Sequence, residues 1–248
     1  MLQRWRKFRS TFSLFLYFAE EVENIMQIDI ITLFPNMFAP LEDSIIKRAR
    51  EKGILDIKFT QLRDFAFDKH RQVDDTPFGG GSGMVLKPEP MFRAVRSVLE
   101  NSLPPEQRRI LIMDPIGEQF TQSKAKELSR YDQLIFICGH YEGFDERIYE
   151  LADEAISIGE YVLTGGELPA MVIIDAVARM LPDVLGSDES AKTDSFYDGG
   201  AGYPQYTKPR DFEGRLVPEV LVSGNHAKIA QWRKEQSELR NLKKEHRI

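Results

Sequence analysis

The amino-acid sequence predicts an α/β protein with a mostly parallel sheet covered by helices on both faces. Residues 109–113 and 133–138 are almost continuously apolar, which is typical of strands that are buried on both faces. Segments with helical periodicity alternate with such strands, as expected for a parallel sheet with crossover helices. The 248 residues, of which 42% are hydrophobic and 29% charged, suffice for one large domain or for one domain with a small appendage.

Residues that favour ends of elements bound most of these segments. Pro35 stops the first strand, Gly53 ends the helix after it, and Pro88 begins a later helix. Residues 64–83 lack periodicity and are rich in charge and glycine, so they form a long loop, which in a compact domain is functional or disordered. The expected strands are residues 27–34, 55–62, 109–113, 133–138 and 155–158, and the expected helices are residues 41–52, 88–100, 123–130, 145–152 and 169–181.

Composition excludes several classes of protein. Cys138 is the only cysteine, which excludes disulfides and cysteine-based zinc sites and makes a cytoplasmic location the default. The four histidines are scattered without the spacing of metal ligands. Because no apolar run is long enough to span a bilayer, we expect no membrane partner.

Charge and composition change towards the C-terminus. The net charge is −6, yet residues 205–248 hold ten Lys and Arg against six Asp and Glu, which leaves 23 basic and 33 acidic residues for the remainder. A basic end on an acidic body indicates a polyanion-binding appendage, and a solvated helical tail explains the composition equally well. We expect a main domain at residues 26–185, a flexible linker at 186–203 and a small helical domain at 204–248, with Trp232 as a core anchor rather than a base-stacking group.

The first 25 residues resemble the start of a signal peptide. Basic residues precede a short apolar run, but the acidic residues that follow make a poor cleavage region. The residues Glu20-Glu21-Val22 can be encoded by GAGGAGGT, a ribosome-binding sequence, a few codons before Met26. We therefore hypothesise that Met26 is the true start and that residues 1–25 are translated leader.

Residues 155–171 contain the most informative pattern in the chain. Gly159 and the pair Gly165-Gly166 lie between apolar fragments, and no Lys or Arg occurs in this stretch. Glycine is needed where backbone turns at positive φ or closely approaches a ligand, and the absence of basic residues disfavours phosphate. The stretch therefore predicts a site for an uncharged, flat ligand held by backbone groups. A tight strand-to-helix connection without a ligand is the alternative.

Three glycine-containing loops are expected to converge. They follow Met113, Cys138 and Ile158, which end parallel strands, and ligands of open α/β sheets bind at the carboxyl ends of strands. This convergence favours the ligand site over the empty connection.

Seven motifs resemble the bacterial tRNA (guanine-N1)-methyltransferases of the TrmD family, in the same order and at the same spacing. They are TLFPNMF at 32–38, HRQVDD at 70–75, GGGSGM at 79–84, YEGFDER at 141–147, SIGEYVLTGGELPAM at 157–171, DSF at 194–196 and SGNH at 223–226. The resemblance runs from Met26 to about Gln236.

The resemblance implies a fold and an activity. The family belongs to the SPOUT class, whose carboxyl-end loops form a deep trefoil knot that holds S-adenosylmethionine in a bent shape. Its members are similar in being obligate homodimers whose active sites are shared by both subunits. They methylate N1 of guanosine 37 in tRNA, next to the anticodon, when a guanosine precedes it.

Site residues follow from the same resemblance. The resemblance implies that Asp194, donated by the other subunit, is the general base for the N1 proton. Arg179 is expected to stabilise charge at guanine O6, although an ion pair with Asp175 on the same helix face is the simpler interpretation. Glu142 matches a position linked to the Mg²⁺ that assists some members, and the metal site itself is unassigned. The expected cofactor-binding residues are Met113, Pro115, Gly117, Gly139, Ser157, Ile158, Gly159, Glu160, Tyr161, Val162, Leu163, Gly165, Gly166 and Pro169.

Two departures from the family pattern and two rival functions accompany this assignment. His140 stands where many members have arginine and others have histidine. Members usually continue well past the helix with Trp232, so a shortened C-terminal domain is expected, which leaves the strength of tRNA binding open. One rival is a non-catalytic RNA-binding protein that keeps the fold, which the presence of Asp194 and Arg179 disfavours. The other is a nucleotide hydrolase with a phosphate loop at 79–83, but no Lys-Ser/Thr pair follows these glycines.

Overall fold

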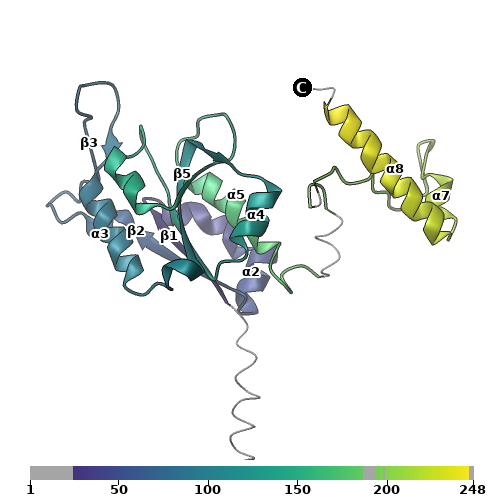
Figure 1. Ribbon diagram of the computed structural model, residues 1–248, viewed down its shortest axis with the longest axis horizontal. Helices are drawn as coiled ribbons and strands as arrows, with labels where there is room; N and C mark the ends of the chain where they lie inside the picture. Colours follow the sequence, from purple (N-terminus) through teal and green to yellow (C-terminus); the bar gives the residue numbers. More distant parts are fainter. Residues whose placement is uncertain (1–24, 187–193, 198, 246–248) are drawn as a thin grey trace, which may run out of the picture.

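The computed structural model describes residues 25–186, 194–197 and 199–245 (Figure 1). The translated-leader hypothesis therefore concerns residues that lie almost entirely outside the described part. None of the described helices is long and apolar enough to cross a membrane.

A five-stranded sheet forms the centre of the fold, in the order β2-β1-β6-β5-β7 (Figure 1). Every neighbouring pair in it is parallel, which confirms the predicted parallel sheet. Two antiparallel pairs, β3 with β4 and β8 with β9, lie outside it. The strands are β1 Met26–Thr32, β2 Leu55–Gln61, β3 Asp74–Asp75, β4 Val85–Leu86, β5 Arg108–Gln119, β6 Gln133–Ile137, β7 Glu154–Ser157, β8 Asp211–Phe212 and β9 Arg215–Leu216.

Helices occur close to the predicted positions. The helix expected at 41–52 begins only at Ser44, because the side chain of Asp43 accepts a hydrogen bond from the Ser44 N–H and caps the helix there. The expected helix at 145–152 is a 3₁₀ helix. The α-helices are α2 Ser44–Glu51, α3 Pro88–Leu99, α4 Gln122–Leu128, α5 Glu167–Ala178, α7 Glu219–Val222 and α8 His226–Glu245, and the 3₁₀ helices are η1 Pro35–Glu42, η2 Leu62–Phe65, η3 Pro105–Gln107 and η4 Glu146–Leu151.

Both faces of the sheet are buried, each against its own helices. In β6 the side chains of Leu134 and Phe136 pack into one apolar cluster with α2, α4 and α5. The alternate residues Ile135 and Ile137 pack into a second cluster with α3, η2 and η4. All four are fully buried, as expected when a continuous apolar run forms a central parallel strand. The prediction of helices on both faces is confirmed.

Strand β5 is longer than the predicted strand at 109–113. Met113 and Glu118 both pair with Ile156 of β7, so residues 114–117 bulge outwards and pairing resumes after them. The Asp114-Pro115 pair therefore marks a bulge in the strand and not its end.

A buried lysine forms ion pairs that join α4 to the outer strands of the sheet. Lys124 of α4 lies 2.9 Å from Glu154 of β7 and 3.1 Å from both Glu118 and Glu127. Arg109 of β5 contacts the other oxygen of Glu154 at 2.5 Å. Burial alone raises the pKa of Glu154, but the hydrogen bonds from Lys124 and Arg109 outweigh it and hold the pKa below its usual value. This network ties α4 to the strand that leads into the segment from Ser157 onwards.

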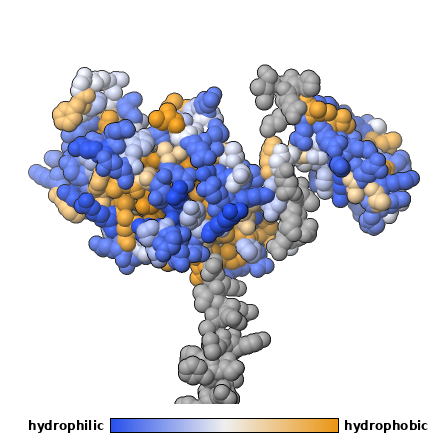
Figure 2. Space-filling view, viewed as in Figure 1, coloured by the Kyte–Doolittle hydropathy of each residue, from blue (hydrophilic) through white to orange (hydrophobic). Residues whose placement is uncertain are grey.

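The C-terminal segment contains α7, α8 and the β8–β9 pair. Trp232 is half-buried, and its ring lies 6.3 Å from that of Tyr206. Arg233 lies over the ring of Tyr203 at 4.7 Å. Most of the visible surface of α8 is hydrophilic (Figure 2). Trp232 thus packs within this segment, in line with its expected role as an anchor.

Candidate functional site

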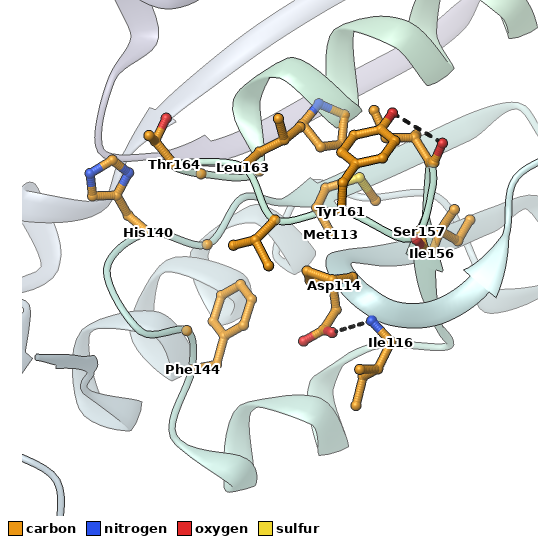
Figure 3. A pocket seen from close by; sticks show the side chains of 18 of the residues that line it. Met113, Asp114, Ile116, His140, Phe144, Ile156, Ser157, Tyr161, Leu163 and Thr164 are labelled. Carbon is orange, nitrogen blue, oxygen red and sulfur yellow. Dashed lines mark hydrogen bonds between the residues drawn. The ribbon is translucent and has the colours of Figure 1, made fainter. Parts of the chain in front are cut away.

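A cavity of about 300 Å³ lies at the bulge of β5 and at the carboxyl ends of β6 and β7 (Figure 3). Its walls come from the β5 bulge, the loop after β6 and the segment between β7 and α5. This is the edge of the sheet at which the sequence predicted a ligand site. The lining residues are Met113, Asp114, Pro115, Ile116, Gly139, His140, Tyr141, Glu142, Gly143, Phe144, Ile156, Ser157, Ile158, Gly159, Tyr161, Val162, Leu163, Thr164, Gly165, Gly166 and Pro169.

The structure brings most of the expected cofactor-binding residues together around this cavity. Gly117 and Glu160 are the two that do not line it. A Cβ atom on Gly117 would lie 2.4 Å from the main-chain carbon of Ala155, so this glycine permits two chain segments to cross closely. Glu160 is exposed. The lining residues that the sequence did not single out as cofactor-binding are Asp114, Ile116, His140, Tyr141, Gly143, Phe144, Ile156 and Thr164, besides Glu142.

The Gly165-Gly166 bend presses against the loop after β6. Gly166 N–H donates to the carbonyl of Gly139 at 2.8 Å, and His140 forms an isolated bridge with Gly165. A Cβ on Gly166 would lie 2.9 Å from both Cys138 Cα and Gly139 N. Because backbone lies where a side chain would otherwise project, only glycine permits this approach.

The turn after β7 is held by its own polar groups. The Ser157 hydroxyl donates to the Gly159 carbonyl at 3.0 Å, and its oxygen lies 3.1 Å from the Gly159 N–H. The Tyr161 hydroxyl donates to the Ile158 carbonyl at 3.3 Å, and the Tyr161 ring covers Gly159, where a Cβ would lie 2.2 Å from it. The turn is therefore shaped before any ligand enters.

Asp114 places a carboxylate in the cavity wall (Figure 3). Its oxygens accept hydrogen bonds from the Ile116 N–H at 2.8 Å and from the Tyr149 hydroxyl. Burial and this hydrogen bond raise the pKa of Tyr149, which keeps its hydroxyl protonated as a donor. An Asp-Pro pair after a buried strand was the signal in the sequence for this residue. No Lys or Arg is among the described residues that line the cavity.

Glu142 lines the same cavity and joins it to the long loop. Its N–H donates to the Met84 carbonyl at 3.0 Å, and a Cβ on Gly83 would lie 2.3 Å from the Glu142 side chain. Within the described ranges, no three His, Cys, Asp or Glu residues are grouped as metal ligands. The residues present therefore do not fit a protein-held Mg²⁺ site, and we derive no role for one.

The phosphate-loop alternative does not fit the structure. The glycines at 79–83 are followed by β4, and α3 begins only at Pro88. A phosphate loop needs a helix N-terminus directly after its glycines. The long loop instead pairs with the loop after β6, through Leu86 N–H and the Gly143 carbonyl at 3.0 Å.

Arg179 and Asp194 form an ion pair away from the cavity. Arg179 caps the C-terminal end of α5, whereas Gly166 at the other end of this helix lines the cavity. Twelve residues separate these ends, which corresponds to about 18 Å of helix. The carboxylate that Arg179 contacts is Asp194, whereas the alternative interpretation of the sequence was an ion pair with Asp175. Within one chain the pair does not line the cavity.

The parallel sheet and the cavity at its carboxyl edge, which has no Lys or Arg among its described lining residues, define an α/β protein with a pocket of a size that suits a small ligand. Comparison with known proteins identifies the family. The family described as tRNA (Guanine-1)-methyltransferase TrmD matches residues 26–247, and the chain belongs to it.

Individual relatives agree with this membership. A tRNA (guanine-N(1)-)-methyltransferase of Leuconostoc mesenteroides is 57% identical over 212 residues, covering 86% of this chain and 86% of the relative. A protein of the same name from Lacticaseibacillus paracasei is 55% identical, covering 86% and 82%. Another from Dehalococcoides mccartyi is 54% identical over 221 residues, covering 88% of both chains.

Proposed function

We propose that this protein transfers a methyl group from S-adenosylmethionine to N1 of guanosine 37 in tRNAs that carry a guanosine before it. The observation that carries the proposal is the cavity between three chain segments at the carboxyl edge of the sheet, with no Lys or Arg among its described lining residues, in a member of the TrmD family. Such an enzyme acts in the cytoplasm, where its tRNA substrates are found.

The residues of the cavity fit the methyl donor. Gly139 and Gly166 both line the cavity, and the absence of side chains at these two positions lets the chain segments that form its wall approach each other closely. The carboxylates of Asp114 and Glu142 complement the positive charges of the donor. When bound, S-adenosylmethionine supplies an electrophilic methyl group.

The guanine must lose its N1 proton for N1 to become nucleophilic. We assign Asp194 as the general base that accepts this proton and Arg179 as the cation that stabilises charge developing at O6. The two side chains already contact each other and are partly exposed, with 48% and 33% of their side-chain surface accessible. They can therefore exchange their mutual contact for contacts to a base.

A second subunit would bring the pair to a cavity. Pro169 of α5 lines the cavity, and the ten residues from it to Arg179 correspond to about 15 Å of helix in the same chain. Leu168 and Val172, four residues apart on one face of α5, and Val162 in the adjacent loop are exposed apolar residues. We infer a homodimer that buries these residues and places Arg179 and Asp194 of one protomer over the cavity of its partner.

The remaining assignments follow the family. A deep trefoil knot at the cavity is supported by the two close crossings, at Gly117 beside Ala155 and at Gly166 beside Cys138. We propose residues 26–185 as the catalytic domain, 186–203 as the linker and 204–248 as the tRNA-binding domain. The excess of basic residues in 205–248 supports contact with the tRNA backbone.

Methyl transfer from labelled S-adenosylmethionine to a tRNA transcript tests the function. We expect label in a transcript with guanosines 36 and 37 and none when guanosine 37 is changed to adenosine. Label that is insensitive to this change would overturn the assignment. Tight tRNA binding without transfer would instead indicate the non-catalytic RNA-binding protein.

A further inference from the structure

Glu167 is a charged residue buried directly behind the cavity. It is the first residue of α5, and only 1% of its surface is exposed. Its Oε1 accepts a hydrogen bond from the Thr32 hydroxyl at 2.7 Å, at the end of β1. Its Oε2 has no hydrogen-bond partner among the described residues. A buried carboxylate oxygen without a donor is unfavourable, so a donor is expected nearby.

His140 supplies the complementary unpaired atom. Its Nδ1 is the other buried side-chain atom without a partner in the described part of the chain. A Cβ built on Gly165 would lie 2.4 Å from Glu167 Oε2 and 2.8 Å from His140 Nδ1. The two atoms are therefore separated by no more than the sum of these distances. The absent side chain of Gly165 leaves the space between them open.

Glu167 lies between the N-terminus of α5 and the loop after β6. Its carboxylate lies at the N-terminus of α5, where the helix dipole stabilises anions. Burial raises the pKa of the neighbouring Cys138 thiol, and the Glu167 carboxylate acts in the same direction. The imidazole of His140 is held from its other sides by Phe34, with ring centroids 4.8 Å apart, and by the edge of Tyr141 at 4.9 Å.

We propose that Glu167 is a positioning residue whose Oε2 accepts the Nδ1–H of His140 and thereby fixes the tautomer of this histidine. One hydrogen bond then satisfies both unpaired atoms. The Thr32 hydroxyl, the Glu167 carboxylate and the His140 ring form a chain that links β1, α5 and the loop after β6. A buried carboxylate that orients an imidazole in this way leaves the other ring nitrogen, Nε2, as an acceptor.

The Nε2 acceptor of His140 can serve substrate recognition in the cavity, an inference that rests on the proposed function. His140 lines the cavity and lies beside Thr164, apart from Met113 and Phe144 (Figure 3). Nε2 at the cavity rim can accept a hydrogen bond from an N–H group of the incoming purine. We therefore infer that Glu167 acts through His140 on recognition of the substrate base, without contacting the base itself.

The variant Glu167→Gln provides a sharp test because it preserves shape and reverses polarity. A Gln side chain can still accept from Thr32 through its oxygen, but its amide would donate to His140 Nδ1. The histidine must then carry its proton on Nε2. We expect ¹⁵N–¹H correlation spectra of histidine-labelled protein to show the Nδ1–H form in the wild type and the Nε2–H form in Glu167→Gln, with the His140 signal assigned from His140→Gln.

Kinetics provide the second measurement. With the acceptor at the rim replaced by a donor, kcat/KM for tRNA should fall roughly tenfold in Glu167→Gln, as for the loss of one hydrogen bond, while the affinity for S-adenosylmethionine changes less than about twofold. Glu51→Gln, at an exposed site at the end of α2, is the matched control and should leave both values unchanged.

The tautomer spectra test the role of Glu167, and the methyl-transfer assay tests the proposed function. The Nε2–H form in the wild type, or the same tautomer in both proteins, would overturn the proposal, and the wild-type spectrum decides this even if Glu167→Gln does not fold. Absence of methyl transfer by the wild type would refute the proposed function instead and leave the tautomer result interpretable.

Discussion

The ligand cavity and the Arg179–Asp194 pair lie at opposite ends of α5 and are built differently. Part of the cavity wall is glycine main chain, and at Gly166 the backbone of another segment fills the place of a side chain. The pair consists of two partly exposed charged side chains that contact each other. A site made of backbone is complete and preorganised within one chain. A site made of charged side chains gains its function only when another surface covers it.

The largest effect is expected for Asp194→Asn. Loss of the general base should reduce turnover by about 10²–10⁴-fold, while the affinity for S-adenosylmethionine stays within about twofold, because the cavity is remote from this residue. Single-turnover methylation and calorimetric titration measure the two quantities. Asp183→Asn, an exposed aspartate at a positive φ that asparagine also adopts, is the control. A collapse of donor affinity would show that Asp194 is not the base.

Gly166→Ala, at the other end of α5, should weaken the binding of S-adenosylmethionine. A methyl group here would lie 2.9 Å from the backbone of Cys138 and Gly139, so these two segments of the cavity wall must move apart. Overpacking of about 1–3 kcal/mol, if it falls on the bound state, corresponds to a loss of donor affinity of roughly 5- to 150-fold. Gly186→Ala, where a Cβ meets nothing within 4 Å, should bind the donor normally. Equal affinities of both variants would contradict the close-approach argument.

The same two substitutions test whether the two regions belong to different protomers of one site. A heterodimer of an Asp194→Asn subunit and a Gly166→Ala subunit, purified through two different tags, has one cavity and one base intact, on separate chains. We expect it to recover about half of wild-type turnover, since one of two equivalent sites is restored. Activity no higher than that of either variant alone would exclude the shared site.

The smallest effect is expected for the ion pairs that join α4 to β7, the strand that leads into the cavity wall. Lys124→Met removes the cation that joins α4 to Glu154 of β7, which should lower the free energy of unfolding by about 1–3 kcal/mol. Thermal unfolding monitored by circular dichroism measures this change. Methionine packs in a similar volume, so an unchanged melting temperature would mean that the network adds no net stability.

The pH dependence of stability sharpens this prediction. The pKa of Glu154 is lower in the folded protein than the ordinary glutamate value of 4.5. The stabilisation is therefore fully present above pH 4.5 and is lost as the pH falls through the lower, folded value. The difference in melting temperature between the wild type and Lys124→Met should shrink below about pH 4. A difference that grows on acidification would contradict the assignment.

Local sequence patterns predicted the sheet better than they predicted its connections. The buried run at 133–138 is confirmed as β6 because a central parallel strand is apolar on both sides. The continuation of β5 beyond Met113 was missed, since Asp-Pro marks a strand end in most contexts. Pairing of residues 118–119 with β7 depends on a strand more than thirty residues away, which no local pattern reveals.

The candidate site shows the same limit. The glycines at 165 and 166 signalled a close approach, and the structure shows which backbone approaches them. Gly117 gave the same signal, but its close neighbour is the backbone of Ala155. The contact between Thr32 and Glu167 joins residues 135 positions apart and could not be read from either motif. Glycine patterns thus locate close approaches without telling whether a ligand or another strand makes them.

The absence of Lys and Arg from the described lining of the cavity bears on competition inside the cell. Adenine is the flat part of many metabolites, and most of them carry phosphates. A cavity that recognised only the adenine would also bind these phosphorylated compounds. A wall that offers carboxylates at Asp114 and Glu142, and no cation, repels a phosphate and attracts a positively charged adenosine derivative. The cavity therefore selects its ligand by the charge beyond the base.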